Sequence, residues 1–184
     1  MPKVVDHEAR RLEILERCFG LFAEQGYAAL SMRSIARALG FSTGTLYYYF
    51  DSKEAIFEEM VRRVASHNVE EASAETPSDA SRAERLAGLM RFIERNAVPL
   101  LQTLQVSLEY RRQQGSPVAQ ELLRSTIGLY RTALIEQLNL TESEGAVALS
   151  FLLGALVQHH LDPDGADIPA HFSVLGRLLS GAPG

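Results

Sequence analysis

Apolar side chains recur along most of the chain at intervals of three and four residues, the spacing that places them on one face of an α-helix. Near the N-terminus the pattern runs through Leu12, Leu15, Phe19 and Phe22 and stops at Gly26, a residue type common at helix C-termini. Runs of alternating β-branched residues, which indicate strands, are absent from the sequence. The pattern therefore predicts an all-α protein.

Two shorter helices are predicted next. Ser31 caps the start of the first and Gly40 ends it, whereas Ser42 or Thr43 caps the second, which continues to Tyr49. After one further turn a longer helix begins, with its own capping pair and a regular apolar face. The N-terminal region is therefore predicted to hold a long helix, two short helices and the start of another long one.

A polar segment over residues 73–82 separates this region from further helical stripes. A serine before Pro117 and a capping box at Thr141 mark helix starts, and Pro99 is interpreted as a kink or the start of a helix. We count about nine helices in all and no internal repeat. The stripes consist of Leu86, Leu89, Ile93 and Ala97, then Leu101, Leu104 and Leu108, then Leu123, Ile127, Tyr130, Leu134 and Leu138.

Composition adds the class of protein. With 184 residues and 46% hydrophobic residues, the chain can bury one large core or two small ones. The apolar run over residues 146–157 is shorter than the roughly 20 residues that span a bilayer, and no signal-type stretch follows Met1. The single cysteine, Cys18, excludes an internal disulfide and is interpreted as a small apolar residue of a helix. A cytoplasmic protein is predicted.

Charge divides the chain into two parts. The formal net charge is −5, but residues 1–53 carry about +1 and residues 54–184 about −6. A polyanion is therefore expected to dock on the N-terminal part. The charge division, together with the helix pattern, predicts an N-terminal domain over residues 1–53 and a second helical domain over residues 54–184.

Two short helices joined by a glycine turn are typical of the helix-turn-helix motif, whose second helix enters the major groove of DNA. In the second short helix Leu46 and Phe50 are four residues apart and are predicted to point inward. An outer face of threonines, a glycine and tyrosines is unusual for solvent and suits a nucleic acid. The alternative is that the tyrosines are core residues. The outer face consists of Thr43, Gly44, Thr45, Tyr47 and Tyr48.

The chemistry of this face matches DNA. Gly44 lets a backbone approach closely, and threonine hydroxyls and methyls can contact base edges. Tyrosines can pack a ring on a sugar and donate a hydroxyl to a phosphate. Lys53 supplies a positive charge at the rim.

Taken together, these residues resemble the TetR family of bacterial transcriptional regulators. The resemblance implies phosphate contacts from Ser31 and Arg33 and a backbone contact from Lys53, whereas Tyr49 departs from the histidine often found before the phenylalanine. The predicted DNA contacts are Ser31, Arg33, Ser42, Thr43, Gly44, Thr45, Tyr47, Tyr48 and Lys53. The matching residues are Gly26-Tyr27, Ser31-Met32-Arg33, Ile35-Ala36, Gly40-Phe41-Ser42, Gly44-Thr45-Leu46-Tyr47, Phe50 and Lys53-Glu54-Ala55.

Two further sites are predicted in the C-terminal part. The helix over residues 146–157 is apolar nearly all round, so it must be covered on more than one side, and in this family the last two helices usually form the dimer interface. The predicted dimer residues are Ala146, Leu149, Leu153, Leu156 and Val157. The resemblance also implies a ligand cavity between residues 82 and 138, whereas plain core is the alternative. The candidate pocket residues are Phe92, Leu104, Leu108, Tyr110, Tyr130 and Phe151.

Glu109 and the pair His159–His160 are weaker candidates for a ligand site or a metal site. Glu109 is interpreted as a solvated surface carboxylate, with a cationic ligand as the alternative. His159 and His160 point about 100° apart on a helix and have no further ligand at metal spacing, so no metal or cofactor is predicted.

The sequence therefore predicts a regulator, most simply a repressor, that binds a palindromic DNA operator as a homodimer and is released by a small apolar or amphipathic molecule. One alternative is a regulator that answers to a protein partner or to no ligand. Another is a helical enzyme, which would need a nucleophile–base pattern, a phosphate-binding loop or metal spacing that the sequence lacks.

Overall fold

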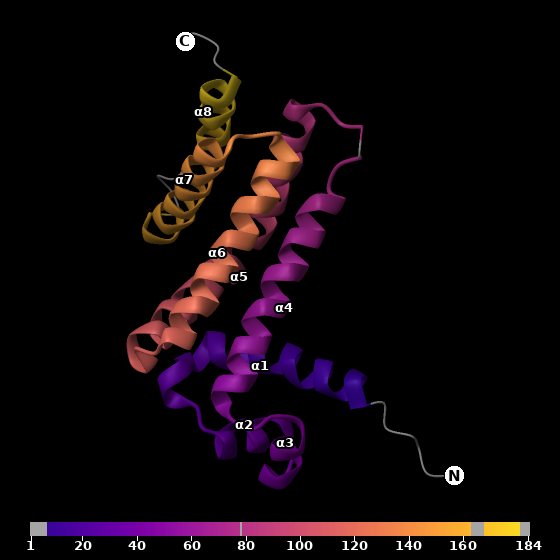
Figure 1. Ribbon diagram of the computed structural model, residues 1–184, viewed down its shortest axis with the longest axis vertical. Coiled ribbons are helices and arrows are strands. Elements are labelled where there is room, and N and C mark those ends of the chain that lie inside the picture. Colours follow the sequence, from indigo (N-terminus) through magenta and orange to yellow (C-terminus); the bar gives the residue numbers. More distant parts are fainter. Residues whose placement is uncertain (1–6, 78, 163–167, 181–184) are drawn as a thin grey trace, which may run out of the picture. The chain divides into compact units, whose positions relative to one another are not determined.

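The computed structural model describes residues 7–77, 79–162 and 168–180, and within these ranges it contains eight α-helices and no strand. The predicted all-α class is confirmed. The helices, labelled in Figure 1, are α1 (His7–Ala29), α2 (Met32–Leu39), α3 (Thr43–Tyr49), α4 (Lys53–Ala74), α5 (Arg82–Gln114), α6 (Pro117–Leu138), α7 (Glu142–Leu161) and α8 (Ile168–Ser180).

The predicted count of about nine differs from the eight observed because α5 is a single helix. The sequence pattern divided this segment near Pro99, which instead lies inside the helix. Proline removes one backbone hydrogen bond of a helix and crowds the preceding turn. Ala97 and Leu101 on either side of it are both buried, and the apolar area that they bury offsets the lost bond.

The described chain forms two compact units. The N-terminal unit combines Met1–Val64 with Thr103–Leu123, and the C-terminal unit combines Ala65–Gln102 with Arg124–Gly184. The distal part of α5 and the start of α6 therefore pack with the helix-turn-helix. The sequence pattern did not indicate this association, and the functional boundary at residue 53 stays a prediction.

The core of the N-terminal unit is aromatic at its centre. Phe57 is fully buried, and its ring centroid lies 5.1 Å from that of Phe22, 5.1 Å from that of Tyr27 and 4.6 Å from that of Tyr110. These contacts join α1, α4 and α5. Leu46 and Phe50 are buried in the same core, as predicted, so these two side chains anchor α3 to the N-terminal core.

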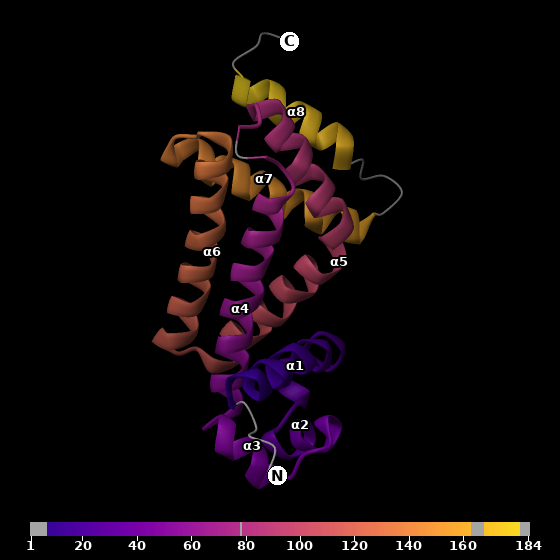
Figure 2. The same ribbon diagram turned by 90° about the vertical axis from the view of Figure 1, so that its right-hand side faces the viewer.

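The core of the C-terminal unit is aliphatic. Leu89 and Phe92 of α5, Leu134 of α6 and Leu152 of α7 are buried together with Phe172 of α8. Helix α8 lies across the N-terminal part of α5 (Figure 2), and a methyl group added at Gly176 would come within 2.8 Å of the Leu86 side chain. This close approach depends on the missing side chain at Gly176.

Cys18 is fully buried in the N-terminal core, which confirms its interpretation as a small apolar residue. Burial raises the pKa of its thiol to about 12, so at neutral pH almost none of the reactive thiolate forms. We expect iodoacetamide at pH 7.5 to leave the folded protein unmodified, as measured by intact mass. In guanidinium chloride the same reagent should add one group, and rapid labelling of the folded protein would contradict the buried placement.

No helix in the described ranges is both long and apolar enough to cross a membrane alone. Helices α6 and α7 reach the length and apolar composition of a membrane span only when they are counted together, and the pair is bent by 113° at the break between them.

Candidate nucleic-acid interface

Local capping fixes the two short helices. The Ser31 hydroxyl accepts from the Ser34 backbone N–H, and the Ser34 hydroxyl accepts from the Ser31 N–H in return. Gly40 ends α2 with a φ of 77°, a left-handed conformation that favours glycine. The Ser42 hydroxyl then caps α3 by accepting from the Thr45 N–H at 2.9 Å. The turn geometry predicted for this motif is therefore present.

The structure brings most of the predicted DNA contacts onto the exposed side of α2 and α3. Tyr47 is 52% exposed and Tyr48 is 71% exposed, so these two phenol rings point outward, whereas Tyr49 is half-buried against the core. Thr43 and Lys53 are half-buried. The exposed remainder consists of Ser31, Arg33, Ser42, Gly44 and Thr45.

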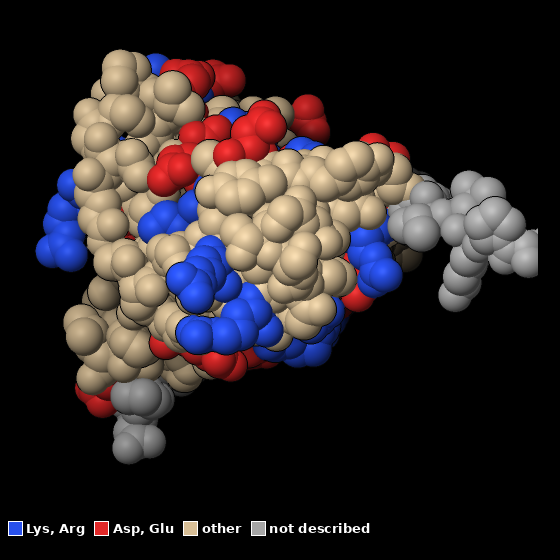
Figure 3. All heavy atoms as spheres, turned by 90° about the horizontal axis from the view of Figure 1, so that it is seen from below, with Lys and Arg blue, Asp and Glu red and all other residues tan. Residues whose placement is uncertain are grey.

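The view from the side of α2 and α3 shows a broad uncharged surface with Lys and Arg side chains at several places along its border and Asp and Glu side chains at others (Figure 3). Such a surface suits a duplex, because uncharged groups can meet base edges and sugars while Lys and Arg side chains at its border meet phosphates.

Side chains at the start of α1 support α3, and sequence reasoning missed them. The His7 ring lies 5.4 Å from the Tyr48 ring and 4.7 Å from the Tyr49 ring, centroid to centroid. Arg11 donates to the Tyr49 carbonyl and to the Glu59 carboxylate, and the hydrogen bond with Glu59 raises the pKa of Arg11. Basic residues one turn apart at the start of a helix were the only signal in the sequence.

Lys53 holds the C-terminal end of α1 and Leu30, the residue that follows it. Its ammonium donates to the carbonyls of Tyr27 and Leu30, both at 2.9 Å, and lies 3.9 Å from the centre of the Tyr27 ring. Burial lowers the pKa of Lys53. Since an ammonium carries three donors, these two bonds leave one N–H for another acceptor.

The six candidate pocket residues are divided between the two units. Leu104, Leu108 and Tyr110 belong to the N-terminal unit, where Tyr110 is buried and donates to Glu58 at 2.7 Å. The remaining three belong to the C-terminal unit, where Phe92 is buried, the hydroxyl of Tyr130 accepts from Asn68 at 3.0 Å, and the Phe151 ring lies 6.1 Å from that of His171.

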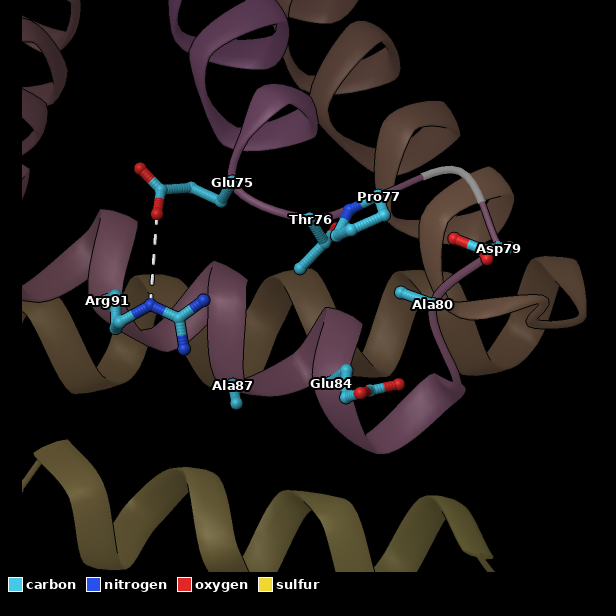
Figure 4. A pocket seen from close by; sticks show the side chains of 8 residues that line it. All are labelled: Glu75, Thr76, Pro77, Asp79, Ala80, Glu84, Ala87 and Arg91. Carbon is cyan, nitrogen blue, oxygen red and sulfur yellow. Dashed lines mark ion pairs between the residues drawn. The ribbon is translucent and has the colours of Figure 1, made fainter.

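A hollow of about 330 Å³ lies in the C-terminal unit at the junction of α4 and α5 (Figure 4). Half of its eight lining residues are charged, and the Glu75 carboxylate is 3.8 Å from the Arg91 guanidinium. None of the six candidate pocket residues lines it. The lining residues are Glu75, Thr76, Pro77, Asp79, Ala80, Glu84, Ala87 and Arg91.

Helix α7 has one face that no described residue of the chain covers. Ala148, Leu152 and Leu156 are buried against the C-terminal core, but the opposite side is exposed, and no Asp, Glu, Lys or Arg occurs between residues 145 and 161. Of the predicted dimer residues, Ala146 and Val157 are exposed, Leu149 and Leu153 are half-buried and Leu156 is buried. The exposed α7 face consists of Ala146, Val147, Ser150, Gly154, Val157 and Leu161.

Comparison with known proteins agrees with this geometry. Residues 14–60 match the sequence model of the bacterial regulatory proteins of the tetR family. Through this region the chain belongs to the TetR family. The resemblance inferred from α2, α3 and their flanks is thereby confirmed.

Relatives of this TetR-family chain are similar over the same region. The repressor KstR2 of Rhodococcus jostii is 47% identical over 53 residues, which are 29% of this chain and 26% of the relative. The regulator BetI of Rhizobium meliloti is 31% identical over 91 residues, 50% of this chain and 45% of the relative. The chain thus matches less than half the length of these curated relatives.

Solved structures share the fold of this TetR-family chain over nearly its whole length. A transcriptional regulator of a Rhodococcus species superposes with a TM-score of 0.73 at 21% identity, covering 93% of this chain and 96% of that one. At this identity the likeness shows the fold alone.

Proposed function

We propose that this TetR-family protein is a transcriptional repressor that binds a palindromic DNA operator as a homodimer, in the cytoplasm and without a cofactor, and that a small apolar or amphipathic molecule releases it. The observation that carries the proposal is the exposed pair Tyr47 and Tyr48 on a seven-residue helix whose other side is buried.

The length of α3 argues for two copies. A helix of seven residues spans only about 10 Å and reads few base pairs, so one copy gives little discrimination against a genome of competing sites. A twofold dimer presents two such helices to half-sites about one helical turn, or a multiple, apart. The uncharged exposed face of α7 supports pairing through the last two helices.

Contacts at the rim extend the same proposal. Ser31 and Arg33 lie at the exposed start of α2, where hydroxyl and guanidinium groups can meet phosphates. Lys53 uses two of its donors within the chain, and we assign its third to a phosphate. Binding of that phosphate would then be linked to the turn that precedes α2.

A second candidate keeps the DNA-binding surface but answers to a protein partner or to no ligand. The observation that favours it is the buried, hydrogen-bonded state of Tyr110, which fills core space rather than lining an open cavity. Native mass spectrometry distinguishes the two, since a retained small molecule supports the ligand-released repressor and an empty dimer with no thermal shift across a metabolite panel supports the second candidate.

Selection of bound fragments from a random DNA pool tests the central proposal. We expect a palindrome to be recovered, and Tyr47→Ala to weaken binding to it by about 1–3 kcal/mol because the ring and hydroxyl contacts are lost. Lys53→Ala should also weaken binding and lower the slope of log affinity against log salt by about one. Fluorescence anisotropy over a salt series measures both effects.

The matched control is Ile127→Ala on α6, which truncates a side chain of similar exposure, 48%, outside α2 and α3. Its operator affinity should equal that of the wild type. Recovery of no enriched sequence, or unchanged affinity in both the Tyr47 and Lys53 variants, would rule out the assignment.

A further inference from the structure

Residues 26–30 are the end of α1, beyond its kink at Gly26, and the residue that follows it; we name this segment the α1–α2 turn. Its backbone groups are bonded by side chains of other helices. Gly26 interrupts the helix with a φ of 77° and a ψ of 164°. Beyond it, the backbone N–H groups of Tyr27 and Ala28 donate to the two carboxylate oxygens of Glu109, at 2.9 and 3.1 Å. Hydrogen bonds to an ionised acceptor are roughly twice as strong as neutral ones.

The fit of this carboxylate is specific. A methyl group added at Gly26 would lie 2.8 Å from Glu109 Oε2, closer than such contacts occur, and the positive φ of Gly26 disfavours any other residue. The interpretation of Glu109 as a solvated surface carboxylate is therefore wrong. The Glu109 side chain accepts hydrogen bonds from backbone N–H groups just after the kink in α1, although Glu109 lies 82 positions after Tyr27 in the sequence.

A positively charged side chain on another helix also bonds to the α1–α2 turn. Lys53, at the start of α4, donates to the carbonyls of Tyr27 and Leu30. Glu109 on α5 thus holds the donors of the α1–α2 turn, and Lys53 on α4 holds its acceptors. Because the turn leads directly into Ser31, the N-cap of α2, these two side chains fix where α2 begins.

Neighbouring residues of α5 strengthen the attachment. The Gln114 amide donates to the Tyr27 hydroxyl at 3.0 Å and to the Glu54 carboxylate at 3.1 Å, and Tyr110 donates to Glu58. The Tyr27 ring also packs 4.8 Å from the Tyr110 ring. Residues 109–114 of α5 are therefore bonded to both α1 and α4.

From this geometry we propose that Glu109 is a positioning residue for DNA binding. It lies outside the DNA-contacting set, yet it holds the α1–α2 turn and thereby the placement of α2 and α3. The proposal rests on the proposed function, because it names the residue through which α5 governs the same DNA-binding surface.

The expected effect on DNA affinity depends on the fraction of protein molecules in which the α1–α2 turn is held in place. When only a fraction of molecules has the turn in place, the apparent dissociation constant rises in inverse proportion to that fraction. Simple electrostatics predicts the opposite sign, because removal of a negative charge from a DNA-binding unit strengthens its attraction to phosphates. The sign of the change therefore separates positioning from charge.

The variant Glu109→Gln tests this difference. Glutamine keeps one acceptor oxygen and presents an NH₂ group to the other backbone donor, so we expect operator binding to weaken about tenfold. The slope of log affinity against log salt should not change, since no phosphate contact is removed. The control Glu24→Gln removes the same charge from an exposed position of α1 and should bind equally well or more tightly. Glu109→Gln binding as tightly as the wild type would overturn the proposal.

Amide hydrogen exchange tests the contact itself, without DNA. In the wild-type protein the Tyr27 and Ala28 amides should be protected, and in Glu109→Gln they should exchange at least about tenfold faster while amides of α7 are unchanged. Exchange of both wild-type amides at the rate of an unfolded chain would also overturn the proposal. The wild-type measurement tests the contact between Glu109 and the α1–α2 turn even if the variant does not fold. It also tests that contact if no operator is found, a result that would count against the proposed function and not against the contact.

Discussion

Replacement of Val157 by glutamate is expected to convert the protein to a monomer and to weaken operator binding by about a hundredfold or more. Val157 is 39% exposed on the exposed α7 face, and no Asp, Glu, Lys or Arg occurs between residues 145 and 161. If two copies pair through this face, the variant buries two carboxylates without partners, at a cost of several kcal/mol. Each α3 would then bind its half-site alone.

Analytical ultracentrifugation measures the first effect and fluorescence anisotropy the second. The matched control is Val118→Glu, which makes the same change at a valine that is 55% exposed on α6. This control should remain a dimer with the affinity of the wild type. A Val157→Glu protein that is still a dimer would show that pairing uses another surface.

Replacement of Phe57 by alanine is expected to cost about 3–5 kcal/mol of unfolding free energy. The side chain is fully buried and touches three aromatic rings from α1 and α5, so the truncation removes apolar contacts and leaves a cavity that rigid neighbours fill poorly. A domain typically has only about 5–15 kcal/mol of stability, and urea denaturation followed by circular dichroism should show most of it lost.

Tyr48→Ala is the control for the stability loss expected in Phe57→Ala. It also removes an aromatic ring, but one that is 71% exposed, and its stability should change by less than about 0.5 kcal/mol. Equal losses in the two variants would contradict the aromatic core described for the N-terminal unit.

The N-terminal helices could be predicted from the sequence because their signals are local. Ser31 and Ser42 each cap the helix that follows, and Gly40 supplies the left-handed residue that ends α2. The inward direction of Leu46 and Phe50 follows from their spacing of four residues. These features need only neighbours in the chain, and the structure contains all of them.

The supporting contacts could not be predicted because they join residues far apart in the sequence. Glu109 and Tyr27 are separated by 82 positions, and Gln114 and Glu54 by 60. A carboxylate in an amphipathic helix looks the same whether water or two backbone amides solvate it. Likewise Pro99 carries a strong local signal for a helix boundary, and only the burial of its neighbours overrides it.

The sequence of the N-terminal unit is interrupted, since Met1–Val64 is completed by Thr103–Leu123. During synthesis the first 64 residues leave the ribosome without Tyr110 and Glu109, so their aromatic centre stays open and their backbone turn stays uncapped. The N-terminal unit can therefore close only after residue 123 has emerged from the ribosome. A fragment cut after α3 or within α4 should therefore be a poor substitute for the whole protein in experiments on DNA.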